Sequence, residues 1–202
     1  MPRRALLLAA FLAAVTALPS SAAAPKPQVT DPKGDALGAQ PGADLASVTF
    51  ATTGTGSGRA YVAKKLVVTM AMAGDVITTP GLTYEISTET SSCGRVTLSA
   101  QQGSPYSQVT HLNGWADWGD CMSRADATSN VELLTAAVKG NTITWSFSLK
   151  MLPKELAVRT SFTTFEARID PTNPVIPFPS SATQTENGLV DVATSDVVWK
   201  MR

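Results

Sequence analysis

Three aspartates near the start of the chain have the types and spacing of ligands for a hard cation. Asp31 and Asp35 lie in the segment TDPKGDA, and Asp44 follows in GADL. Calcium binds carboxylate and carbonyl oxygens in flexible geometry, and a glycine-bearing loop can gather such oxygens. The spacing is not that of an EF-hand, and Asp-Pro and Gly-Asp pairs are also ordinary turn chemistry. The residues alone favour the turn, with calcium as the second interpretation.

A second group of candidate ligand-binding residues lies in the segment HLNGWADWGDC, which ends at the second cysteine. Indole rings stack on the apolar faces of sugars, while carboxylates and amides bind the hydroxyls. Trp115 and Trp118 could form such a platform, with Asn113 and Asp117 as the polar partners. The alternative is that one or both rings cap the core beneath a loop, because tryptophan is usually well buried.

The only two cysteines, Cys93 and Cys121, are expected to form a disulfide. An even pair in an exported chain reads as a structural bridge. The loop that it closes is worth roughly 3–4 kcal/mol in the chain-entropy treatment. A redox pair or a metal site would be the alternative, but neither Cys-x-x-Cys spacing nor a histidine beside either cysteine is present.

Catalytic patterns are weak in this sequence, so we expect a protein that is not an enzyme. His111 is the only histidine, and the Gly-rich segment 54–58 reads GTGSG, without the Gly-x-Ser-x-Gly pattern of a nucleophile elbow. Four glutamates could in principle pair for glycoside hydrolysis, but each fits a solvent-facing strand position. They are Glu85, Glu89, Glu132 and Glu166.

The first 23 residues have the layout of a secretory signal peptide. A short basic region with Arg3 and Arg4 precedes an apolar stretch, residues 5–18, and small residues follow with a cleavage site near Ala23. The apolar stretch is too short for a membrane span. Without Arg3 and Arg4 the chain has 14 basic and 16 acidic residues, which gives no electrostatic case for nucleic acid. The sequence therefore predicts a secreted, extracellular protein.

The elements that must position these residues are predicted to be strands. The clearest pair runs from Asn130 to Leu149, where apolar residues alternate with Thr and Ser after a turn at Gly140-Asn141. About eight to ten such short strands predict an all-β fold, an antiparallel β-sandwich of jelly-roll or immunoglobulin-like type. It would form one domain over residues 44–202, after an irregular segment 24–43. One short helix is expected near 152–158, and residues 101–130 are expected to be mostly loop.

The motifs DPKGD, ADLASV and the closing GLVDVATSD, with the hairpin VKGNTITWSFSLKMLPKEL, resemble secreted bacterial β-sandwich modules. These modules are related to the glucodextranase C-terminal domain and to the DOMON and family 9 carbohydrate-binding group. The resemblance implies a jelly-roll-like sandwich that binds calcium or sugar in some members and haem in a few. It matches Asp31, Asp35 and Asp44 to the opening motif and Asp191 to the closing one. This chain lacks the Met/His pair for haem and the longer Asp-Asp run of many relatives.

These observations predict a secreted, non-enzymatic module that binds a glycan or a cell-surface polymer, with a structural calcium ion as the candidate cofactor. The alternative is an exported structural or protein-interaction module, such as an envelope-associated protein or an inhibitor. Exposure of Trp115 and Trp118 on one face would distinguish the first from the second.

Overall fold

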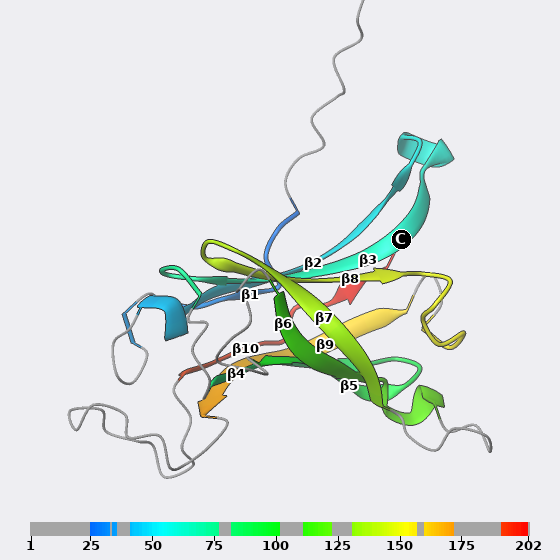
Figure 1. The fold of residues 1–202 in the computed structure, drawn as a ribbon. Helices are drawn as coiled ribbons and strands as arrows, with labels where there is room; N and C mark the ends of the chain where they lie inside the picture. The colour runs from blue at the N-terminus through cyan, green and yellow to red at the C-terminus, as the bar shows by residue number, and fades with distance from the viewer. Residues whose placement is uncertain are drawn as a thin grey trace, which may run out of the picture.

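The computed structural model describes residues 25–32, 34–35, 41–76, 82–101, 111–122, 131–156, 160–171 and 191–201. In these ranges the chain forms strands and three short 3-10 turns, with no α-helix (Figure 1). The predicted all-β, antiparallel class is confirmed. The predicted signal peptide lies outside the described residues. None of the described helical segments has the length and apolar character needed to cross a bilayer.

Eleven strands belong to one antiparallel sheet. Their bounds are β1 Val29–Thr30, β2 Leu45–Thr55, β3 Val62–Met72, β4 Leu82–Thr90, β5 Gly94–Gln101, β6 His111–Asp117, β7 Val131–Lys139, β8 Thr142–Ser148, β9 Ser161–Pro171, β10 Asp191–Ser195 and β11 Trp199–Lys200. The 3-10 turns are η1 Pro41–Ala43, η2 Gly58–Ala60 and η3 Gly119–Met122.

The sheet curls until its two end strands meet. The strand order is β1-β2-β3-β8-β7-β6-β5-β4-β9-β10, with β11 also paired to β9, and β1 at one end contacts β10 at the other. The sheet is therefore nearly closed as a barrel, and the two packed layers of a sandwich are not confirmed. We call the line along which β1 and β10 meet the seam. The segment expected to be irregular, 24–43, supplies β1 to this seam.

The predicted hairpin is present with the expected alternation. Ile143, Trp145 and Phe147 on β8 are buried, while the Thr and Ser residues between them are half-buried or exposed. Lys139 pairs with Thr142, so the loop has two residues, and Gly140 has a φ of 56°. Glycine takes this left-handed conformation without steric cost, as a tight hairpin turn requires.

The core of the sheet is mainly apolar, and the buried ring of Trp145 has a hydrogen-bond partner for its N–H. The Trp145 indole Nε1 donates to the Ser99 carbonyl at 3.1 Å. Phe50, Phe162 and Phe165 form an aromatic cluster against which Trp199 packs. A ring that buries its faces and satisfies its N–H contributes to stability without an unpaired donor. Packing of this core fixes the strands, and the strands in turn position the residues of the seam and of the outer surface of the sheet.

Two predictions about elements are wrong. Within the expected loop 101–130, residues His111–Asp117 form β6, in the middle of the sheet between β5 and β7. The described part of the expected helix, residues 152–156, forms turns and bends, and the Leu156 N–H donates to the Pro153 carbonyl. A helix this short cannot offset its nucleation cost, and burial of Leu152 and Leu156 holds the turn on the core instead.

Candidate functional site

All four aspartates that were predicted as metal ligands lie together at the seam. Asp31 follows β1 directly, Asp44 precedes β2, and Asp191 is the first residue of β10. The Asp31 N–H donates to the Ala46 carbonyl, and the Leu45 N–H donates to Asp191 Oδ2 at 2.6 Å. The second bond crosses the seam from β2 to β10. Closure of the sheet therefore brings residues from the two ends of the chain into one cluster.

The cluster is compact and partly buried. One carboxylate oxygen from each of Asp31, Asp35, Asp44 and Asp191 can be chosen so that all lie within 4.8 Å of one another. Asp44 is 5% exposed and Asp191 8%, whereas Asp35 is exposed. The site therefore has a buried floor made by Asp44 and Asp191 and an opening toward solvent beside Asp35.

Two carboxylate oxygens in this cluster are buried without a hydrogen-bond partner. Asp44 Oδ2 accepts from the Gly34 N–H at 2.7 Å, but Asp44 Oδ1 has no partner, and neither has Asp31 Oδ2. A buried, unpaired carboxylate oxygen is costly, and native proteins normally pair such atoms or bind a metal with them. The two oxygens therefore have the chemistry of ligands for a cation.

The electrostatics of the cluster lead to the same inference. Burial is the largest cause of the rise of the Asp31 pKa from 3.8 to about 6, and the negative charges of the other three aspartates add to it. Burial also raises the pKa of Asp191, although the Leu45 N–H opposes part of that rise. The cluster repels added negative charge and would gain from a cation among its oxygens.

The raised pKa of Asp31 predicts how the cation-free protein responds to pH. Because the folded pKa of about 6 exceeds the ordinary value of 3.8, the native state holds a proton that the unfolded state releases between these values. The free energy of unfolding without a cation should therefore be larger near pH 4 than near pH 7, and it should decrease as the pH rises through about 6. Melting temperatures in chelator at pH 4.5 and pH 7 would measure this for the wild type and for Asp31→Asn. The variant should show the smaller pH response, and equal responses would contradict the assignment to Asp31.

The tryptophan platform predicted from the sequence is not formed. Trp118 is 2% exposed, in the core, with its ring edge-on to Phe147 at 5.2 Å between centroids. Trp115 is half-buried on the outer face of β6. The two rings are three residues apart, and residues an odd number apart on an extended chain point to opposite faces. The sequence analysis predicted a loop here, and a loop does not require side chains to alternate between two faces.

Three of the four predicted ligand-binding residues nevertheless share one face. Asn113, Trp115 and Asp117 occupy alternate positions of β6 and point outward, with Asn113 exposed and the other two half-buried. Opposite Trp115 on β5 is Ser99, whose Oγ accepts from the Trp115 N–H at 3.3 Å. We call this surface the outer β6 face.

An ion-pair network that the sequence reading missed borders this face across β4 and β9. Arg168 lies 2.7 Å from Glu85, 2.9 Å from Asp170 and 3.8 Å from Glu166. Burial raises the pKa of Glu85, and the Arg168 guanidinium opposes part of that rise. The sequence pattern that could have predicted this network is the run of charged residues at alternate positions of β9, Glu166, Arg168 and Asp170. All three carboxylates pair with one guanidinium, so this network is structural.

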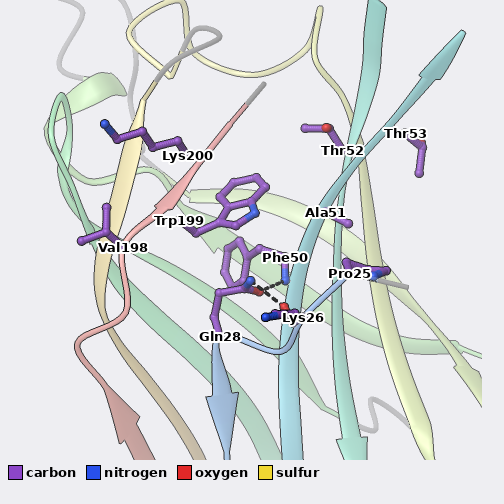
Figure 2. A pocket seen from close by; sticks show the side chains of 10 residues that line it. All are labelled: Pro25, Lys26, Gln28, Phe50, Ala51, Thr52, Thr53, Val198, Trp199 and Lys200. Atoms are coloured by element: carbon purple, nitrogen blue, oxygen red, sulfur yellow. Dashed lines mark hydrogen bonds between the residues drawn. The ribbon is translucent and has the colours of Figure 1, made fainter. Parts of the chain in front are cut away.

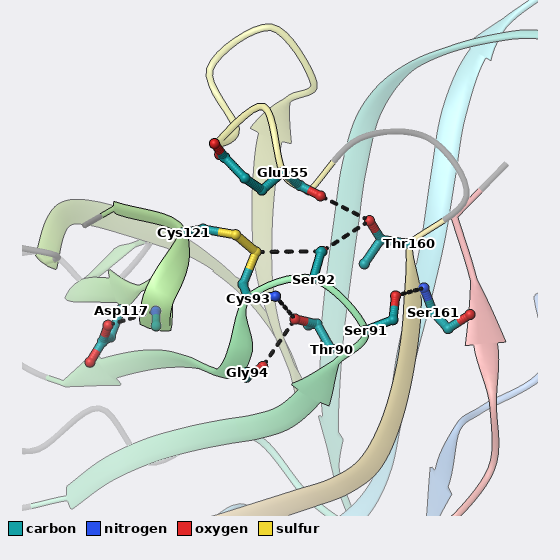
Figure 3. The surroundings of a disulfide bond; sticks show 11 residues. Thr90, Ser91, Ser92, Cys93, Gly94, Asp117, Cys121, Glu155, Thr160 and Ser161 are labelled. Atoms are coloured by element: carbon teal, nitrogen blue, oxygen red, sulfur yellow. Dashed lines mark hydrogen bonds between the residues drawn. A yellow bond between two sulfur atoms is a disulfide. The ribbon is translucent and has the colours of Figure 1, made fainter. Parts of the chain in front are cut away.

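The predicted disulfide joins Cys93 and Cys121 and fixes the end of the outer β6 face (Figure 3). It ties the turn between β4 and β5 to η3, which follows β6. Around it, Thr90 Oγ1 accepts from the Cys93 N–H at 2.9 Å and donates to the Gly94 carbonyl at 3.0 Å. Asp117 Oδ1 accepts from the Gly119 N–H at 2.9 Å, so Asp117 also holds the turn into η3.

The comparisons with known proteins leave the resemblance to carbohydrate-binding modules as a prediction. No family model matches this chain, and no curated protein or solved structure matches it either.

Proposed function

We propose that this protein is a secreted, non-enzymatic binding module whose sheet is locked at the seam by a calcium ion. The observation that carries the proposal is the buried, partnerless Asp44 Oδ1 inside a cluster of four carboxylates. The outer β6 face would bind the ligand, a glycan or a cell-surface polymer. The ion would hold β1, β2 and β10 together, so that ligand binding depends on it through the integrity of the sheet.

The dimensions of the cluster favour calcium over magnesium. Calcium–oxygen distances of about 2.3–2.6 Å put ligands on opposite sides of the ion about 4.6–5.2 Å apart. The 4.8 Å within which the four oxygens lie fits that span. Magnesium requires about 2.0–2.1 Å, or at most about 4.2 Å across the ion. The open side beside Asp35 leaves room for the water ligands that complete a calcium shell.

The outer β6 face has the chemistry for a sugar, although it offers one indole ring in place of two. Trp115 can stack on an apolar sugar face, and the exposed Asn113 can bond hydroxyls on one side of it. Gln101, which pairs with Asn113 from β5, adds a second amide to the same row. This arrangement is an open strip across strands, and such a strip suits a polymer better than a small molecule.

Retention on insoluble polysaccharides and cell walls, with calcium or with chelator, tests the function. Trp115→Ala should weaken retention about tenfold, the usual cost of removing a tryptophan at the centre of a binding surface. Val62→Ala, at an exposed apolar residue of β3, is the matched control and should retain fully. Loss of retention in chelator would support the role of the ion. If Trp115→Ala binds as well as the wild type, the outer β6 face is not the binding site.

The second candidate is an exported structural or protein-interaction module, such as an envelope-associated protein or an inhibitor. Burial of Trp118 favours it, because a glycan surface with a single half-buried ring is smaller than the platform expected from the sequence. Export is supported in both cases by the disulfide, since such bonds persist in oxidising compartments. Absence of retention on every polymer would leave this candidate.

A further inference from the structure

Away from the aspartate cluster, the sheet leaves a slot between β2 and β11. A cavity of about 1150 Å³ lies there, lined by residues 50–53 of β2, by Val198 and the two residues of β11, and by Pro25, Lys26 and Gln28 (Figure 2). Neighbouring residues in a strand point to opposite faces of a sheet. Consecutive residues of both strands nevertheless line this cavity, so it lies against the edges of the two strands. We call it the edge slot.

The β2 edge in this slot is able to form hydrogen bonds that β1 does not supply. On this edge the Val48 and Ala46 carbonyls accept from the N–H groups of Gln28 and Asp31, the two residues that flank β1. The Phe50 N–H is taken by a side-chain atom, Gln28 Oε1, and not by a strand. The same alternation puts the N–H and C=O groups of Thr52 on this edge, before the irregularity that follows Thr53. Among the described residues, no strand pairs with β2 on this side beyond Val48.

Two prolines explain why β1 stops before the slot. Val29 pairs with Val48, and the same register extended backward would put Pro27 opposite Phe50 and Pro25 opposite Thr52. These are the positions at which β1 would have to donate N–H groups to β2. Proline has no N–H, so it cannot continue the ladder. The sequence therefore stops its own strand here, and in the described part of the chain no strand pairs with this edge of β2 from Phe50 onward.

The lining of the slot selects the chemistry of an occupant. Trp199 is half-buried and its ring lies 5.7 Å from that of Phe50, which makes an aromatic floor, and Val198 beside it is 57% exposed. Lys26 and Lys200 are both exposed at the rim, and no carboxylate is among the lining residues that the structure describes. A strand placed here would bury alternate apolar side chains on the aromatic floor and bring acidic ones to the lysines.

We propose that the edge slot receives an extended, acidic segment of a partner protein, which adds a strand to the free edge of β2. Strand addition of this kind takes its affinity from main-chain hydrogen bonds and its specificity from alternate side chains. A second copy of this chain is a poorer occupant. Pairing two β2 edges about a two-fold axis would bring the lysines of both copies to one interface.

Fluorescence anisotropy of the exported protein with a panel of labelled decapeptides tests this proposal. In the panel, Val or Tyr alternates with Glu, and matched peptides carry Lys for Glu or Pro at every second position. The acidic peptides should bind, and both substitutions in the peptide should weaken binding at least tenfold. Thr52→Pro, which removes an N–H from the slot edge, should weaken binding at least tenfold while the circular dichroism spectrum stays unchanged.

Charge reversal keeps the test decisive if Thr52→Pro fails to fold. Lys26→Glu with Lys200→Glu should also cost at least tenfold, whereas Lys139→Glu with Lys154→Glu, at two exposed lysines outside the slot, should cost nothing. The proposal is overturned if no acidic peptide binds, or if binding is indifferent to both sets of slot variants. A concentration-dependent dimer that Thr52→Pro dissociates would also overturn it, in favour of a second copy as the occupant.

Discussion

Calcium at 100 times its dissociation constant is expected to raise the melting temperature by about 5–11 °C. A ligand at that concentration stabilises the native state by about 2.7 kcal/mol, and each kcal/mol shifts melting by about 2–4 °C for a chain of this size. The physical source is the seam, where a cation would pair Asp44 Oδ1 and Asp31 Oδ2 and cancel the repulsion among four carboxylates. Differential scanning calorimetry in calcium and in chelator measures the shift.

The variant Asp44→Asn tests whether the ion can be lost while the native fold is kept. Asparagine keeps an oxygen that can accept from the Gly34 N–H but removes one buried charge. In chelator the variant should therefore melt at or above the wild-type temperature, and in calcium it should gain little. Titration calorimetry should count one calcium ion per wild-type chain and none per variant chain.

The matched control for Asp44→Asn is Asp196→Asn, at an exposed aspartate between β10 and β11. It should show the full calcium response. Magnesium should stabilise the wild type less than calcium, because it requires near-ideal octahedral geometry and gives up its water ligands reluctantly. A wild-type melting temperature that is the same in calcium and in chelator would refute the cation site.

Loss of the disulfide is the second large effect. Cys93 and Cys121 are 28 residues apart, and a loop of that length gives about 3.5 kcal/mol of stabilisation through the unfolded state. We therefore expect the double variant Cys93→Ala with Cys121→Ala to melt about 7–14 °C below the wild type. Both cysteines are buried against the core, so small apolar replacements avoid leaving a polar atom there.

Reductant supplies the control for this experiment. It should lower the melting temperature of the wild type and leave the double variant unchanged. Thiol titration of protein purified from an oxidising compartment should find no free cysteine. Two free thiols per chain, or a double variant as stable as the wild type, would show that the bridge does not stabilise the native fold.

Local patterns determined much of the fold. The period-two run on β8 and the glycine at position 140 specify the β7–β8 hairpin, because both signals act within a few residues. The same alternation of buried and less buried positions recurs on β3, where Met70 is buried, and on β4, where Tyr84 is buried. β6 was missed because Gly and Ala occupy two of its alternate sequence positions, 114 and 116. Residues this small add little to an alternating hydrophobic pattern. The sequence therefore did not show to which side of the sheet each tryptophan points.

What only the tertiary structure decided is how the ends of the sheet meet. The sequence by itself determined the class of fold, the pairing of the only two cysteines and a loop carrying Asp31, Asp35 and Asp44. Asp191 is 147 residues from Asp44, and nothing local relates them; curling of the sheet brings β10 against β1 and β2 and completes the cluster. The edge slot also depends on the tertiary structure. Pro25 and Pro27 lack N–H groups, and this matters only because the folded sheet places them beside the edge of β2. Contacts of long sequence separation depend on the sum of many weak local preferences, and no single pattern in the chain encodes that sum.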